Sequence, residues 1–143
     1  MEQVRGAAEK ALSTFLLWFL TFLFSLRVAG QAIQRWAAQP FLPPFDAFQG
    51  SNLPYPALLA SQVLILGGMI FCNLRSPKGG RVLLWIGSLY MAGSLLRIAV
   101  GLAVPGAPAW FSTWIPALFH VVLAGYVLTL ATPRGRSRAG TWE

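Results

Sequence analysis

Four long apolar segments, separated by shorter polar or proline-rich stretches, divide the chain. They cover approximately residues 11–29, 57–74, 82–104 and 113–132. Each holds roughly 18 to 23 residues, enough at about 1.5 Å per residue to cross a hydrocarbon core of roughly 30 Å. None shows the alternation of a membrane β-strand. The pattern predicts an all-α integral membrane protein, a single membrane domain (residues 1–143) with four transmembrane helices in an antiparallel bundle.

Basic residues gather beside the ends of these segments and predict how the chain crosses the membrane. The connection at residues 105–111 has no Lys or Arg, whereas three other segments are basic: Arg5 and Lys10; Arg75, Lys78 and Arg81; Arg134, Arg136 and Arg138. The positive-inside rule therefore predicts cytoplasmic termini and a cytoplasmic turn at 75–81. The location expected is the plasma membrane, most simply a bacterial inner membrane, with the tail 133–143 touching anionic lipid at the cytoplasmic face.

The first apolar segment has a second interpretation as a cleaved signal peptide. Arg5 and Lys10 precede it, and Val28-Ala29-Gly30 resembles a cleavage site. The apolar stretch is long for such a peptide, and Arg27 stands just before the candidate site. An uncleaved first helix is therefore favoured.

Composition narrows the function classes. Of the 143 residues 56% are hydrophobic and only 10% are charged, too few to cover a soluble domain of this size. The net charge of +7 would otherwise suggest nucleic acid, but basic residues beside apolar spans are explained by lipid headgroups. The single cysteine, Cys72, excludes an internal disulfide, a CxxC redox pair and a multi-thiolate metal site. No catalytic motif is present, so we do not expect an enzyme.

Polar residues inside the spans are costly and indicate function or a buried interface. Arg27, Gln62, Arg97 and His120 all fall in the predicted outer half of the bilayer, and Asp46 is the only acid on that side. We expect Asp46 to pair with one arginine, leaving charge for an anionic or carbonyl-bearing ligand such as a lipid headgroup or a quinone. Haem is not expected, because one histidine cannot supply two axial ligands.

Each of these residues also has a purely structural interpretation. Arg27 can reach outer headgroup phosphates by snorkelling, and Arg97 can reach the interface or Asp46. His120 can be a hydrogen-bonded packing residue, and Gln62 can join two helices.

The helical period predicts which faces meet inside the bundle. Residues three or four apart share a face, and small residues there allow close packing. The predicted inward stripes are Thr14, Trp18, Thr21 and Ser25 on the first helix; Gly87, Tyr90, Ser94, Arg97 and Gly101 on the third; and Thr113, Ala117, His120, Ala124 and Ala131 on the fourth.

The external connection 30–56 is too apolar for a loop in water, with aromatic residues at Phe41, Phe45 and Tyr55. Residues 31–38 can extend the first helix until Pro40 stops it. The remainder either lies in the membrane interface or folds over the bundle as a lid that carries Asp46 above Arg97 and His120.

In length and number of spans the chain resembles small bacterial four-helix families such as the DoxX-like proteins, an outline without a shared residue motif. The favoured hypothesis is a non-enzymatic accessory or binding subunit with an outer-half polar pocket. One alternative is a membrane redox or lipid- or quinone-handling enzyme that uses His120 for proton transfer. Another is a homo-oligomeric channel or transporter. The expected partners are the lipid bilayer, a second copy or another membrane protein.

Overall fold

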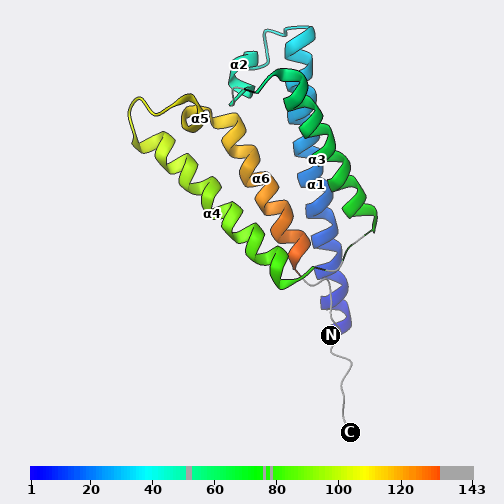
Figure 1. Cartoon of the computed structure of the whole chain (residues 1–143). Helices are drawn as coiled ribbons and strands as arrows, with labels where there is room; N and C mark the ends of the chain where they lie inside the picture. The colour runs from blue at the N-terminus through cyan, green and yellow to red at the C-terminus, as the bar shows by residue number, and fades with distance from the viewer. Residues whose placement is uncertain (51–52, 76, 78, 133–143) are drawn as a thin grey trace.

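The computed structural model describes residues 1–50, 53–75, 77 and 79–132, and within these ranges every regular element is a helix (Figure 1). Four helices are long and apolar enough to span a membrane, as predicted. They and two short helices are α1 (Glu2–Trp36), α2 (Phe45–Phe48), α3 (Tyr55–Arg75), α4 (Arg81–Ala103), α5 (Ala109–Ser112) and α6 (Trp114–Ala131). The predicted basic tail 133–143 and Lys78 lie outside the described residues.

Helix α1 is longer than the apolar pattern predicts. It begins at Glu2 instead of residue 11, and it continues through Trp36, which confirms the expected extension toward Pro40. Its 35 residues measure about 52 Å at about 1.5 Å per residue, well beyond a core of roughly 30 Å. An ion pair four residues apart, Arg5 to Glu9 at 3.3 Å, supports the polar N-terminal turns. Part of α1 therefore extends outside the hydrocarbon.

The long helices alternate in direction and pack in the spatial order α4, α6, α1, α3 (Figure 1). Helix α6 lies between α4 and α1, and the first and last long helices of the chain are therefore neighbours. The N-terminus of α1 and the α3–α4 connection lie at one end of the molecule, while α2 and α5 lie at the other (Figure 1). We refer to these as the basic end and the pocket end.

The apolar core is formed by three of the four long helices. Helices α1, α3 and α6 supply its buried side chains, which are Leu17, Phe24, Val28, Met69, Tyr126 and Leu130. Helix α4 instead packs on α6 and leaves most of its large apolar side chains exposed, among them Leu89, Leu96 and Leu102. Such exposed apolar faces are expected where lipid tails are the solvent.

The predicted inward stripes hold for α4 and α6, but on α1 only the later part holds, where Thr21 is buried and Ser25 is half-buried. Gly87, Ser94 and Arg97 are buried on α4, and the alanines of the α6 stripe are buried as well. On α1, Thr14 and Trp18 are exposed, and Leu17 is the buried residue instead.

The error on α1 has a physical cause. The hydroxyl of Thr14 donates to the carbonyl of Lys10, and that of Ser25 to the carbonyl of Thr21, so neither needs a partner on another helix. Hydroxyl residues therefore give weak evidence about which face of a helix is buried. The large apolar residues decide the rotation of α1.

A polar network crosses the half of the molecule near the basic end. Asn73 Nδ2 donates to Thr21 Oγ1 at 3.0 Å. The buried Tyr126 hydroxyl lies 2.8 Å from the carbonyl oxygen of Met69 and 2.9 Å from Oδ1 of Asn73. We call Thr21, Asn73 and Tyr126 the inner network, and it links α1, α3 and α6.

Candidate functional site

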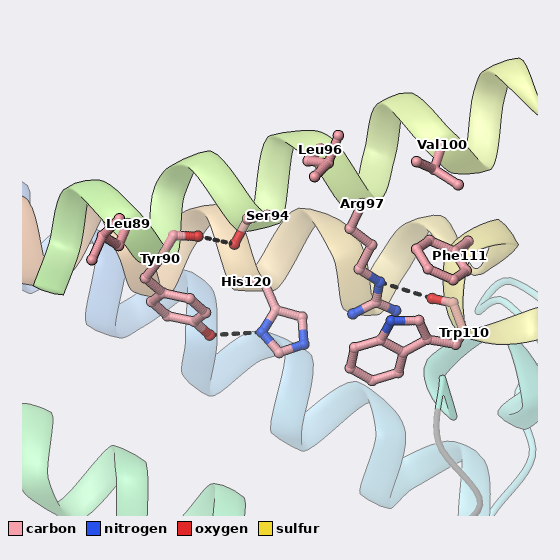
Figure 2. Close-up of a pocket in the computed structure, with 10 residues that line it drawn as sticks. Leu89, Tyr90, Ser94, Leu96, Arg97, Val100, Trp110, Phe111 and His120 are labelled. Atoms are coloured by element: carbon pink, nitrogen blue, oxygen red, sulfur yellow. Dashed lines mark hydrogen bonds between the residues drawn. The ribbon is translucent and has the colours of Figure 1, made fainter.

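A pocket of about 560 Å³ lies between α4, α5 and α6 toward the pocket end (Figure 2). Most of its wall is apolar, and its polar groups come from Tyr90, Ser94, Arg97 and His120. The lining residues are Leu89, Tyr90, Gly93, Ser94, Leu96, Arg97, Val100, Trp110, Phe111 and His120. This combination of an apolar wall with a few polar groups is typical of small-molecule sites.

Close packing of α5 on α4 builds one wall of the pocket. A Cβ atom placed on Gly101 would collide with the backbone carbonyl of Phe111. Only glycine allows this approach, so Gly101 brings the α5 backbone directly against α4. The approach places the Trp110 carbonyl beside Arg97, one turn earlier on α4.

Arg97 is the buried cation of the pocket, with 5% of its surface exposed. Its Nε donates to the carbonyl oxygen of Trp110 at 2.8 Å, and its guanidinium carbon lies 3.9 Å from the centre of the Trp110 ring. The two terminal nitrogens, Nη1 and Nη2, are buried and have no hydrogen-bond partner in the part of the chain that the structure describes. Arg97 is therefore positioned by α5 but only partly satisfied by it.

Tyr90 of α4 and His120 of α6 form a second polar element of the pocket. The Tyr90 hydroxyl lies 2.6 Å from Nδ1 of His120, and their rings pack edge to face with centroids 5.8 Å apart. When Tyr90 donates this bond, Nε2 of His120 carries the hydrogen. Figure 2 shows that this second ring nitrogen lies on the side of Arg97 and Trp110. The imidazole then presents a donor to the pocket.

Of the predicted site residues, the structure brings Arg97 and His120 into this pocket and places Arg27 elsewhere. Arg27 is 8% exposed, its Nη2 donates to the Phe48 carbonyl at 3.2 Å, and its guanidinium lies over the Phe119 ring at 5.6 Å. The snorkelling interpretation of Arg27 is therefore wrong. Arg27 instead holds α2 against α1 and α6.

Gln62 also lies away from the pocket. Its Nε2 donates to Oε1 of the fully buried Gln31 at 3.0 Å, which joins α3 to α1. This contact matches the interhelical interpretation of Gln62. Gln31 is not among the predicted site residues, because it lies in the predicted external connection 30–56.

Asp46 does not pair with an arginine in this structure. It is exposed on α2, and no ion pair joins it to another described residue. Helix α2 packs against α1 and α6 through the buried Phe48, and Gly50 fits against Pro116 of α6. The connection thus folds onto the helices, as the lid interpretation has it, but it does not place Asp46 above Arg97 and His120.

The pocket includes two residues that the sequence did not identify as site residues. Trp110 acts through its backbone carbonyl and ring face, and neither is visible in a pattern of polar side chains. Tyr90 lay in the predicted small-and-polar stripe of α4, and its spacing from Arg97 was the signal available.

Neither metal-binding clusters nor known relatives indicate a function. Within residues 1–50, 53–75, 77 and 79–132, no three His, Cys, Asp or Glu side chains come together as a metal site would require. No protein-family model matches the chain, and no curated protein or solved structure is significantly similar to it. The geometry of the pocket is thus the basis for a functional proposal.

Proposed function

We propose that this protein is a four-pass membrane protein that binds a small membrane-soluble ligand in the pocket between α4, α5 and α6. It acts as a non-enzymatic accessory or binding subunit. One observation carries the proposal: Nη1 and Nη2 of Arg97 are buried without a partner at the wall of a 560 Å³ pocket. A buried guanidinium is costly unless acceptors satisfy it, and the cost is higher inside a bilayer. A ligand with acceptor atoms removes that cost.

The pocket wall indicates what the rest of the ligand is like. Leu89, Leu96, Val100 and Phe111 are apolar and stand beside the polar end formed by Arg97. The volume lies within the roughly 300–1,000 Å³ typical of small-ligand sites. An amphiphile with one acceptor-bearing end and an apolar body therefore fits both parts of the wall.

The proposal includes an orientation in the membrane. Arg5, Lys10, Arg75 and Arg81 all belong to the basic end. By the positive-inside rule this end is cytoplasmic, as are both termini, and the pocket lies in the outer half of a bacterial inner membrane. The four helices then form an antiparallel bundle whose α1–α3 connection is external.

Cysteine labelling tests the orientation, because Cys72 is the only cysteine of the chain. In a Cys72→Ala background, Ala107→Cys should react with an impermeant maleimide in intact spheroplasts, and Gln3→Cys only after lysis. The reverse pattern would overturn the orientation without affecting the pocket.

Native mass spectrometry of the protein released from native membranes tests the binding proposal. The wild-type chain should retain a small molecule that is lost with Arg97→Gln. Arg35→Gln is the matched control, because Arg35 carries the same charge in the outer part of α1 but is exposed and outside the pocket. Equal ligand content in wild type and the folded Arg97→Gln variant would contradict the proposal.

A further inference from the structure

We infer that the ligand of this pocket is a single-chain amphiphile with a carboxylate head, such as a long-chain fatty acid anion. The inference rests on the proposed function and goes beyond it by naming the ligand class. Its basis is the set of donors that the pocket presents, the lack of a carboxylate partner for Arg97 among the placed side chains, the free edge of Arg97 and the shape of the apolar wall.

The charged group of the pocket is a donor, and two backbone carbonyls beside it already accept hydrogen bonds. Arg97 offers Nη1 and Nη2, and His120 offers Nε2–H when Tyr90 donates to Nδ1. The Trp110 carbonyl already accepts from Arg97 Nε, and the Tyr90 carbonyl accepts from the Ser94 hydroxyl at 2.7 Å. A ligand that satisfies Arg97 must bring acceptors, and a cationic head such as an amine is disfavoured because it would add a second positive charge beside the buried guanidinium.

The charge balance favours an anion over a neutral carbonyl compound such as a quinone. The acids at described positions whose side chains are placed are Glu9, which pairs with Arg5, and Asp46, which is exposed. Among these placed side chains no carboxylate pairs with Arg97, and its described partners are the ring and the carbonyl of Trp110. A quinone would accept the hydrogen bonds of Arg97 but leave its buried charge uncompensated. A monoanion would accept the same hydrogen bonds and also compensate the charge.

The free edge of Arg97 favours a head with two equivalent oxygens. Because Nε is bonded to Trp110, the side-on edge of the guanidinium is engaged, while the end-on edge formed by Nη1 and Nη2 is buried and has no hydrogen-bond partner among the described residues. Two parallel N–H groups on that edge match the two oxygens of a carboxylate in a bidentate pair. His120 of the same pocket supplies a further donor.

The tail has a path along α4. Gly93 lies on the pocket wall one turn before Arg97, and a Cβ atom there would meet nothing within 4 Å. Leu89 and Leu96 border the same space. One apolar chain fits a volume of about 560 Å³ beside Gly93, while a two-chain phospholipid is too bulky for it.

The test compares ligands with the same chain and different heads. Dodecanoate, methyl dodecanoate, dodecanol, dodecyl phosphate and a short-chain quinone are titrated calorimetrically into the whole protein in zwitterionic nanodiscs. Dodecanoate should bind at least tenfold more tightly than its methyl ester, since only the acid neutralises Arg97. Arg97→Gln should remove this difference, Arg97→Lys should retain part of it, and Arg35→Gln should leave it unchanged.

A second variant separates recognition of the tail from that of the head. Gly93→Leu fills part of the tail path, and it replaces a poor helix former at an open position, so the variant folds. Gly93→Leu should weaken the binding of dodecanoate and of methyl dodecanoate by the same factor, about tenfold. Arg97→Gln should weaken the binding of dodecanoate alone.

The outcomes distinguish this inference from the proposed function. Equal affinity for the ester or the quinone and for dodecanoate would overturn the carboxylate assignment and leave the binding function standing. Tighter binding of dodecyl phosphate than of dodecanoate would also overturn it. Binding of none of the five compounds, together with no retained molecule in native mass spectrometry, would overturn both.

Discussion

The inner network and the pocket are both polar regions inside an apolar molecule, but they differ in how completely their groups are paired. In the inner network, Asn73 donates to Thr21, and the Tyr126 hydroxyl has two acceptors within reach, the Met69 carbonyl and Oδ1 of Asn73. In the pocket, two nitrogens of Arg97 have no described partner. A satisfied network stabilises one arrangement of helices, whereas a partly satisfied one is costly unless something else completes it. The first region is thus expected to serve the fold, and the second to serve a ligand.

Of the substitutions that test this difference, Gly101→Ala should have the largest effect, on both stability and ligand retention. The new Cβ would collide with the Phe111 carbonyl, and backbone cannot move aside as a side chain can. We expect unfolding in detergent to become easier by about 1–3 kcal/mol, and ligand retention to fall because α5 no longer presents its carbonyl to Arg97. Denaturant titration and native mass spectrometry measure the two effects.

Gly87→Ala is the matched control on the same stripe of α4. A Cβ there would lie 3.0 Å from Leu128 Cδ2, the end of a flexible side chain that can shift. The loss should be clearly smaller than for Gly101→Ala. Equal losses of unfolding free energy in the two variants would mean that the close approach of α5 to α4 at Gly101 has no particular importance for stability.

Tyr126→Phe should break the inner network without touching the pocket. The change removes the hydroxyl that lies against the Met69 carbonyl and Asn73, two contacts that link α6 to α3. We expect a loss of about 1 kcal/mol in unfolding free energy, the upper range for hydrogen bonds between membrane helices, and unchanged ligand affinity. A drop in affinity as large as the drop in stability would show that the two regions are not separate.

Tyr90→Phe makes the same chemical change in the pocket and should have the opposite pattern. His120 loses the hydroxyl that fixes its ring, so its Nε2 donor is no longer held toward the ligand. Affinity should fall about twofold to tenfold, corresponding to one hydrogen bond of roughly 0.5–1.5 kcal/mol, while unfolding changes less than for Tyr126→Phe. Ligand titration beside denaturant titration of both variants provides the comparison.

The smallest expected effect on stability is that of Arg97→Leu in the ligand-free protein. The substitution loses the contacts with Trp110, but it also removes the desolvation cost of a buried, incompletely paired charge, and the two effects nearly cancel. The unfolding free energy should change by no more than about 0.5 kcal/mol, even though ligand binding disappears. A loss of several kcal/mol in unfolding free energy would instead show that Arg97 stabilises the fold. The pocket would then not differ from the inner network in its role.

The sequence predicts the four long helices well and the pocket residues only in part. The four spans are visible because a bilayer requires long apolar helices, and the α4 stripe is visible because Gly87, Ser94 and Arg97 recur at the helical period. Arg97 and His120 line the same pocket.

The remaining features depend on relations that a single sequence does not show. Gln31 pairs with Gln62 because α1 continues past residue 29, and the Trp110 carbonyl reaches Arg97 because α5 folds back on α4. Asp46 was grouped with the arginines because it is the only acid on the predicted external side, yet α2 docks on α1 and α6 and leaves it exposed.

The position of α6 between α4 and α1 has a consequence for how the chain is made. Helix α6 follows α1, α3 and α4 along the chain, but it covers a face of α1. Until α6 is inserted, Leu17 and Asn73 lack the neighbours on α6 that they have in the folded structure. The hairpin of α1 and α3 therefore cannot complete its apolar core before α6 has been synthesised and inserted.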